Sequence, residues 1–372
     1  MALFVVILAL GSYFYWQFSA KKSLIVPFPY SFNQNAGKTF EKEIKLAENA
    51  KILIVGDQMG EILSNYTPEL IDDLAQKFKE PPKIYNWSKP HEGLHRTLFK
   101  IKSMKTLPSI IIYHGASSEL FEKIFDFKDK EEIFKNFSLF DDEKIISLII
   151  TFPWLSKIIY QKMNYFDLGP PKEYVNSLAG PQRIVEKEVA FKLFNYELRE
   201  LIEVTKDKKS NLILITTPIN LEVRPKETCS HSTTNNVVEL QQEIESLLKE
   251  GKFKQAYPKA LELSNETFSN AQSFYLLGRA NMGLGNLAEA RMNLSKASIF
   301  DCANWRGNAI YNAIMKSVAK KHQIRLIDFD QFLSSSLSKD GLFIDEIFPQ
   351  NIFYQTMLKE LQVNIKNILS VD

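Results

Sequence analysis

Cysteine, histidine and glycine are scarce in this sequence of 372 residues, and neither sign of charge dominates. Its two cysteines, Cys229 and Cys302, are too few for a disulfide-rich scaffold, although they allow one disulfide bond. Lysine and arginine total 46 against 44 aspartates and glutamates, for a formal net charge of +2. Without a basic excess the chain has no global field that attracts nucleic acid, so we expect no nucleic-acid partner.

The N-terminus carries a long apolar run, with no charged residue from Ala2 to Phe18. This length only just spans a hydrocarbon core, and the aromatic cluster at positions 13–16 is typical of a membrane interface. The first residues lack lysine and arginine, and positions 18–20 form a poor cleavage site. We therefore expect residues 1–20 to be an uncleaved transmembrane anchor, with its membrane contact over residues 2–18, and keep a cleaved signal peptide as the alternative.

Two features of the sequence give opposing indications of the compartment in which the body lies. Lys21 and Lys22 directly follow the apolar run, which by the positive-inside rule favours a cytoplasmic body. A disulfide between Cys229 and Cys302 would instead be stable in an oxidising compartment such as the periplasm. We expect that disulfide, and we expect a periplasmic or other extracytoplasmic body anchored by the N-terminus.

Short apolar runs predict five buried strands, of which the first three alternate with helices. They lie at residues 51–55, 83–87, 109–113, 211–216 and 324–329. This alternation is typical of the α/β class, with a parallel sheet between two layers of helices. We expect a three-layer α/β/α, flavodoxin-like sheet domain, interrupted by a mostly helical stretch over residues 119–206.

Residues 237–304 show a 34-residue internal repeat that resembles the tetratricopeptide (TPR) pattern. The second copy, residues 271–304, has apolar and small residues at the expected positions: Phe274, Leu277, Gly278, Ala290, Leu294 and Ala297. The first copy, residues 237–270, shares the turn glycine Gly251 and the small Ala256. We expect an all-helical TPR-like insertion that binds another protein, with Phe274, Leu277 and Gly278 as its candidate binding residues.

Three short motifs follow the predicted strands and carry a family resemblance. The first strand ends in Gly56-Asp57-Gln58, the third leads into His114-Gly115-Ala116-Ser117, and Asp345-Glu346-Ile347-Phe348-Pro349 lies near the C-terminus. In order and placement these motifs resemble the conserved blocks of SGNH (GDSL-type) hydrolases. The resemblance implies an SGNH-like domain in two parts, residues 21–236 and 305–372. We expect no cofactor.

The same resemblance implies that the catalytic residues are lost. Gln58 stands where the family has its nucleophilic serine, and an amide cannot form an acyl-enzyme. Phe348 replaces the histidine base beside Asp345, and Ser117 replaces the oxyanion-binding asparagine, while Gly93 matches the oxyanion glycine. We therefore expect a catalytically inactive scaffold protein of the cell envelope.

Three further hypotheses remain open at this level. An esterase or O-acyltransferase acting on envelope carbohydrate or lipid would need a new nucleophile, for which the candidates are Ser88, Ser117 and Ser118, and a new base such as His114. Alternatively, Asp57 and His114 bind a glycan or acyl ligand in the old cleft. Finally, residues 91–95 match the His-Glu-X-X-His zinc pattern, although Pro90 and Gly93 argue against the long helix that this motif requires.

Overall fold

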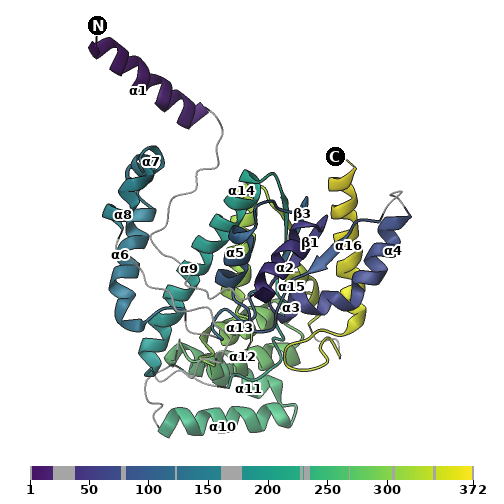
Figure 1. Cartoon of the computed structure of the whole chain (residues 1–372). Helices are drawn as coiled ribbons and strands as arrows, with labels where there is room; N and C mark the ends of the chain where they lie inside the picture. The colour runs from purple at the N-terminus through teal and green to yellow at the C-terminus, as the bar shows by residue number, and fades with distance from the viewer. Residues whose placement is uncertain are drawn as a thin grey trace.

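The computed structural model shows a mixed α/β protein built around one sheet (Figure 1). The structure describes residues 2–19, 38–76, 81–121, 124–160, 178–226, 229, 235–267, 269–303, 306–337 and 341–370.

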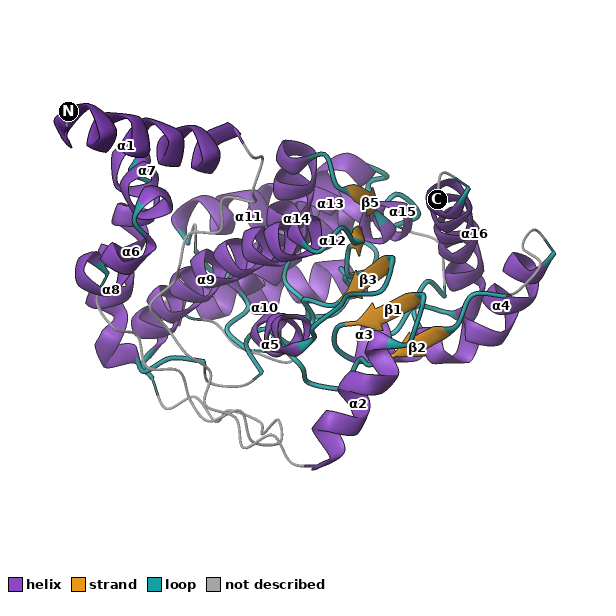
Figure 2. Cartoon of the chain, turned by 45° about the horizontal axis from the view of Figure 1, so that its top comes forward, coloured by secondary structure: helices purple, strands orange, loops and turns teal. Residues whose placement is uncertain are grey.

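Five parallel strands form the central sheet (Figure 2). They are β1 (Ile52–Val55), β2 (Ile84–Asn86), β3 (Ile110–His114), β4 (Asn211–Ile215) and β5 (Arg325–Ile327). Four of the strands lie within their predicted apolar runs, and β3 extends one residue beyond its run, to His114. The order across the sheet, β2-β1-β3-β4-β5, is that of flavodoxin-like doubly wound sheets. In such sheets the chain reverses its direction of winding between β1 and β3, and ligand sites form beyond the carboxyl ends of these two strands.

Helices cover both faces of the sheet, as the α/β pattern predicts. One face carries α2 (Lys38–Glu48), α5 (Leu94–Ser103), α9 (Gly180–Asp207) and α14 (Ala309–His322). The other carries α4 (Thr67–Ala75), α15 (Phe329–Ser334) and α16 (Asn351–Leu369). Alternate strand residues enter the two cores, so the strands are buried on both faces and read as continuous apolar runs.

The segment after β1 differs from its prediction. The sequence pattern predicts one helix from about residue 59 to 79, but the structure has α3 (Gln58–Glu61), a 3₁₀ helix η1 (Ile62–Tyr66), and then α4. Pro68 lies in the first turn of α4, where its missing N–H costs no hydrogen bond. A proline inside one continuous helix would break it, so the break before α4 has a local cause. Residues 77–79 of the predicted helix lie outside the described residues.

A helical unit, which we call the α6–α8 unit (residues 130–159), lies between β3 and β4 in the sequence. It contains α6 (Lys130–Phe140), α7 (Glu143–Thr151), η3 (Pro153–Leu155) and α8 (Ser156–Ile159), and η2 (Phe127–Asp129) precedes it. Its apolar residues pack on the N-terminal half of α9. There the Phe140 ring contacts the rings of Tyr160 and Tyr196, with centroid distances of 4.3 and 4.6 Å.

Four helices occupy the predicted insertion between β4 and β5. They are α10 (Asn235–Lys249), α11 (Phe253–Glu266), α12 (Ala271–Gly283) and α13 (Leu287–Phe300). The α10/α11 and α12/α13 turns contain Gly251 and Gly285, with φ of +72° and +79°, values that favour glycine. The four helices lie together at one end of the molecule (Figure 1).

The predicted disulfide between Cys229 and Cys302 is present. It joins residues 73 apart in the sequence, with a Cα–Cα distance of 5.6 Å. Both cysteines are buried, and they flank the four inserted helices. The disulfide therefore ties the exit from the sheet domain to the return after α13.

The N-terminal run forms a helix, α1 (Ala2–Ser19), which lies beside α7 (Figures 1 and 2). The expected transmembrane span is not supported, because no helix in the described ranges is both long and apolar enough to cross a membrane. The Tyr13 hydroxyl of α1 donates a hydrogen bond to the carbonyl of Thr151 at 2.6 Å, and its ring stacks on Phe152.

Candidate functional site

The carboxyl ends of β1 and β3 approach each other so closely that Gly56 has no room for a side chain. A Cβ atom there would overlap the carbonyl oxygen of His114, and Gly56 has a φ of +138°. Both observations favour glycine over every other residue. This contact brings residues 57–58 next to residues 117–118.

Asp57 is completely buried, and its carboxylate organises both segments. Oδ1 accepts a hydrogen bond from the Met59 N–H at 2.9 Å and so caps α3. Oδ2 accepts from the Ser117 N–H at 2.7 Å and from the Ser117 hydroxyl at 2.6 Å. Burial raises the pKa of Asp57 to about 6, against the opposing effect of these hydrogen bonds. Asp57 is therefore a buried N-cap of α3, and its side chain is not exposed at the rim of a cleft.

Gln58 connects the same segments through its side-chain amide. Nε2 donates a hydrogen bond to the Ser117 Oγ at 2.7 Å. Oε1 accepts hydrogen bonds from the Ser118 hydroxyl at 2.8 Å and from the His91 N–H at 3.1 Å. The amide thereby cross-links the end of β1, the loop after β3 and the segment before α5.

The three candidate serines lack the partner that a nucleophile needs. Both Ser117 and Ser118 are buried, and their hydroxyls donate to Asp57 and Gln58 respectively. The Ser88 hydroxyl is also buried and, within the described chain, has no hydrogen-bond partner. No histidine hydrogen-bonds any of these three hydroxyls in the described structure, so none has the base that would activate it.

His114 ends β3 and is completely buried. Its Nδ1 lies 3.3 Å from the Ile215 carbonyl oxygen, while Nε2 has no hydrogen-bond partner among the described residues. Burial lowers the pKa of His114 to about 4, so the imidazole is neutral at physiological pH. It lies beside the Phe329 ring, with a centroid distance of 6.2 Å. In the described structure, His114 therefore lies in the core and does not line an open crevice.

Gly93 precedes α5, and the N–H group of the next residue, Leu94, already donates to a carboxylate. Both carboxylate oxygens of the buried Glu119 accept from the Leu94 N–H, at 2.9 and 3.1 Å. An oxyanion would have to compete with this carboxylate for the helix N-terminus. The sequence does not reveal this role of Glu119, because the two segments are 25 residues apart.

The C-terminal motif forms a tight turn near the same end of the sheet. Asp345 Oδ1 accepts from the N–H groups of Ile347 and Phe348, both at 2.7 Å, and the Asn220 amide donates to the Asp345 carbonyl. No hydrogen bond in the described structure links this turn to Gln58. Burial raises the pKa of Tyr354, and the nearby Tyr66, Asp57 and Asp345 raise it further.

The two histidines of the zinc pattern do not share a helix. α5 begins at Leu94, after His91, whose ring stacks on Phe121 at 3.9 Å. His95 lies buried inside α5. Among the residues that the structure describes, no three histidine, cysteine, aspartate or glutamate side chains are placed to hold a metal ion.

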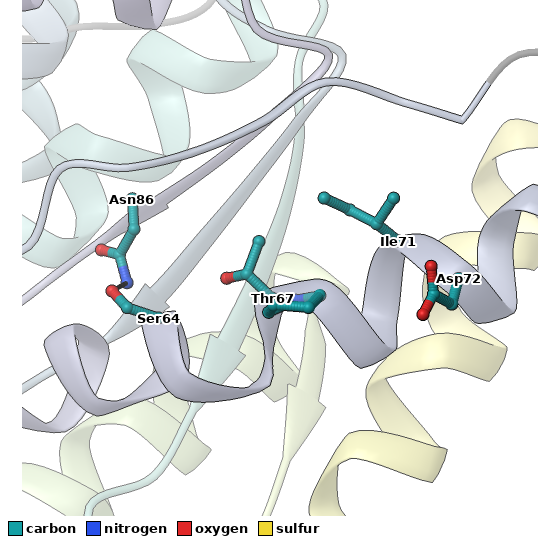
Figure 3. A pocket seen from close by; sticks show the side chains of 6 residues that line it. Ser64, Thr67, Ile71, Asp72 and Asn86 are labelled. Carbon is teal, nitrogen blue, oxygen red and sulfur yellow. Dashed lines mark hydrogen bonds between the residues drawn. The ribbon is translucent and has the colours of Figure 1, made fainter.

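A shallow hollow lies beside the edge strand β2 (Figure 3). Asn86 at its end donates hydrogen bonds to the Ser64 hydroxyl at 2.9 Å and to the Gly60 carbonyl at 2.8 Å. The hollow is lined by Ser64, Thr67, Pro68, Ile71, Asp72 and Asn86. Among these residues, no hydroxyl is hydrogen-bonded to a side chain that could act as its general base.

The candidate binding residues of the insertion are packing residues in the structure. Phe274 is buried and stacks on Phe300, and Leu277 is buried between α11 and α12. A Cβ atom on Gly278 would lie 2.6 Å from the Leu294 Cγ, so α12 and α13 need glycine at this contact. These positions therefore shape the insertion, and a partner would contact other residues on its surface.

The chain matches no protein-family model, and comparisons with curated proteins and with solved structures give no significant match.

Proposed function

We propose that this protein is a non-hydrolytic scaffold of the cell envelope: an SGNH-like domain without the family's catalytic residues, which presents a TPR-like insertion to a protein partner. One observation carries the non-hydrolytic part of the proposal. The Gln58 amide occupies the nucleophile position and is hydrogen-bonded to both neighbouring serine hydroxyls. The site is thus built as a structural cross-link.

The helical hairpins support the TPR-like part of the proposal. The glycines of the two turns, Gly251 and Gly285, are 34 positions apart, which is the TPR period. Small residues at Gly278 and Ala290 allow α12 and α13 to pack closely. Each hairpin buries its apolar face on the next element, as expected of stacked repeats.

Attachments to the sheet domain hold the insertion in place, which suits a scaffold. Ala290 and Leu294 share a core with Ile219, Leu221 and Leu337. The Arg224 guanidinium pairs with Glu245 of α10 at 2.6 Å. Together with the Cys229–Cys302 disulfide, these contacts present a fixed surface to a partner, which lowers the entropic cost of binding.

We further propose an extracytoplasmic body attached to a membrane through α1. The disulfide supports the oxidising compartment, because such bonds are rare in reducing cytosol. α1 has no charged residue and exposes the side chains of Val5–Leu8, so an apolar environment would stabilise it.

Affinity purification from detergent-solubilised native membranes, with quantitative mass spectrometry, tests the scaffold proposal. Gly278→Arg forces α12 away from Leu294, and we expect it to abolish co-purification of a partner that wild type and Gln58→Ala retain. Gln255→Arg adds the same charge at an exposed position of α11 and is the matched control. Limited proteolysis checks that the sheet domain stays folded in each variant.

Two outcomes would overturn the scaffold proposal. One is an unchanged set of co-purified proteins with Gly278→Arg. The other is loss of that set with Gln58→Ala, which would mean that the site at the end of β1 is needed for recruitment.

A further inference from the structure

The α6–α8 unit exposes large apolar side chains over a short stretch. Trp154 is 61% exposed and Ile158 is 70% exposed, and Leu148 of α7 is also exposed. The opposite side of the same stretch is buried on α9, through Ile149 and Tyr160. One side of the unit thus packs on α9, and the other side exposes apolar side chains. We call Leu148, Trp154 and Ile158 the α7–α8 patch.

α1 contacts this unit next to the patch. The Tyr13 hydroxyl bonds to the Thr151 carbonyl at 2.6 Å, and the Tyr13 and Phe152 rings stack with centroids 6.4 Å apart. Trp154 follows Phe152 by two residues, and Leu148 precedes Thr151 by less than one helical turn. The exposed side chains of α1 therefore lie on a helix next to α7, which carries Leu148 of the patch, and Figures 1 and 2 both show α1 beside α7.

The composition of α1 indicates which environment covers both elements. α1 carries no charged residue on any face, and its residues from Val5 to Leu8, which point in successive directions around the helix, are all more than half exposed. A partner protein that covered one face would leave the other faces in water. A lipid phase would cover the exposed faces together, and tryptophan beside such a helix is typical of the lipid–water interface.

We propose that the α7–α8 patch is a second lipid-contacting surface, which inserts Trp154 and Ile158 into the interfacial region of the membrane that α1 enters. The inference rests on the proposed membrane attachment through α1. Two separate contacts with the membrane, one through α1 and one through the patch, would fix the tilt of the body. Interfacial binding of this kind scales with the apolar area that enters the lipid.

Vesicle flotation combined with brominated-lipid quenching tests the proposal. The full-length protein is mixed with vesicles of phosphatidylethanolamine and phosphatidylglycerol, in which brominated acyl chains quench tryptophan that enters the bilayer. We expect wild type to float and to be quenched, and we expect Trp154→Phe to float equally but to lose a distinct share of the quenching. The difference between the two proteins reports the position of Trp154.

A polar double variant measures the energetic contribution of the patch. Trp154→Gln with Ile158→Gln should weaken vesicle binding about ten-fold or more, because two large apolar side chains no longer enter the lipid. The matched control is Ile352→Gln with Val363→Gln, which changes two similarly exposed apolar residues on α16, across the sheet from the α6–α8 unit. The control should bind vesicles like wild type.

The outcomes separate the two proposals. Flotation with no quenching difference between wild type and Trp154→Phe would overturn the patch and leave attachment through α1 intact. Quenching of Trp154 that persists in Val6→Lys with Leu10→Lys would support the patch. The same result would overturn the proposal that α1 is required for membrane attachment. A full-length wild type that does not float would overturn both, and would leave the scaffold role of the insertion untouched.

Discussion

The side-chain amide of Gln58 donates a hydrogen bond from Nε2 to the Ser117 Oγ at 2.7 Å, and this hydroxyl in turn donates to the buried carboxylate of Asp57. Both hydrogen-bonding functions of the Ser117 hydroxyl are therefore in use. The chain of contacts fixes the loop after β3 against the end of β1. The position to which the resemblance to SGNH hydrolases assigns a nucleophile thus holds a side chain that stabilises the fold.

Gln58→Ala should lower the free energy of unfolding by about 1–3 kcal/mol, because it leaves the Ser118 hydroxyl and the His91 N–H without their acceptor. Urea unfolding followed by circular dichroism measures the change. Gln255→Ala, at an exposed position of α11, is the matched control and should change stability by less than about 0.5 kcal/mol. Equal effects of the two substitutions would contradict the structural role of Gln58.

His114 should make the fold sensitive to acid. Burial lowers its pKa from 6.5 to about 4. Between these two pH values the imidazole is protonated in the unfolded chain but neutral in the folded chain. Stability is therefore lost as the pH falls from about 6.5 to 4, by up to about 3 kcal/mol. His114→Leu should remove this loss.

The comparison between wild type and His114→Leu isolates this effect. Asp57, whose pKa is raised to about 6, titrates in the same window with the opposite sign, because its folded form holds the proton more tightly. Asp57 is present in both proteins, so its contribution cancels in the difference between their urea unfolding energies at pH 7 and pH 4.5. A difference that does not change with pH would show that His114 is not buried and neutral.

The sequence predicts the sheet well and the site only in part. Strand β3 could be found because a strand buried on both faces reads as an unbroken apolar run. Its contact with β1 at Gly56 follows from the parallel order of the strands. The cross-links of Gln58 could not be found, because they join polar side chains about 60 positions apart whose pairing depends on the tertiary fold.

Two other predictions failed or changed for physical reasons. The single helix expected after β1 breaks before Pro68, a local signal that the apolar period alone does not reveal. The positions of Asp57 and His114 after strand ends predict a cleft, but both side chains are completely buried. Burial depends on what packs above a residue, which periodicity within one element does not determine.

Removal of the disulfide should lower the free energy of unfolding by about 2–4 kcal/mol, because the bond closes a loop of 73 residues in the unfolded chain. Cys229→Ser with Cys302→Ser provides the reduced equivalent, and urea unfolding gives the change. Native protein should show no free thiol to Ellman's reagent, whereas denatured and reduced protein should show both. Two reactive thiols in the oxidised, denatured protein would contradict the bond and weaken the extracytoplasmic assignment.

The absence of hydrolase chemistry is tested most directly by fluorophosphonate labelling of the full-length protein, with the modified residue located by mass spectrometry. We predict that wild type shows no labelled serine, because no described histidine hydrogen-bonds Ser88, Ser117 or Ser118 and the Ser117 hydroxyl is held by Gln58 and Asp57. Gln58→Ser with Phe348→His, which restores the residue types that the resemblance implies, is the comparison protein. Stoichiometric labelling of Ser88, Ser117 or Ser118 in wild type would contradict the account and identify the protein as an enzyme with a relocated nucleophile.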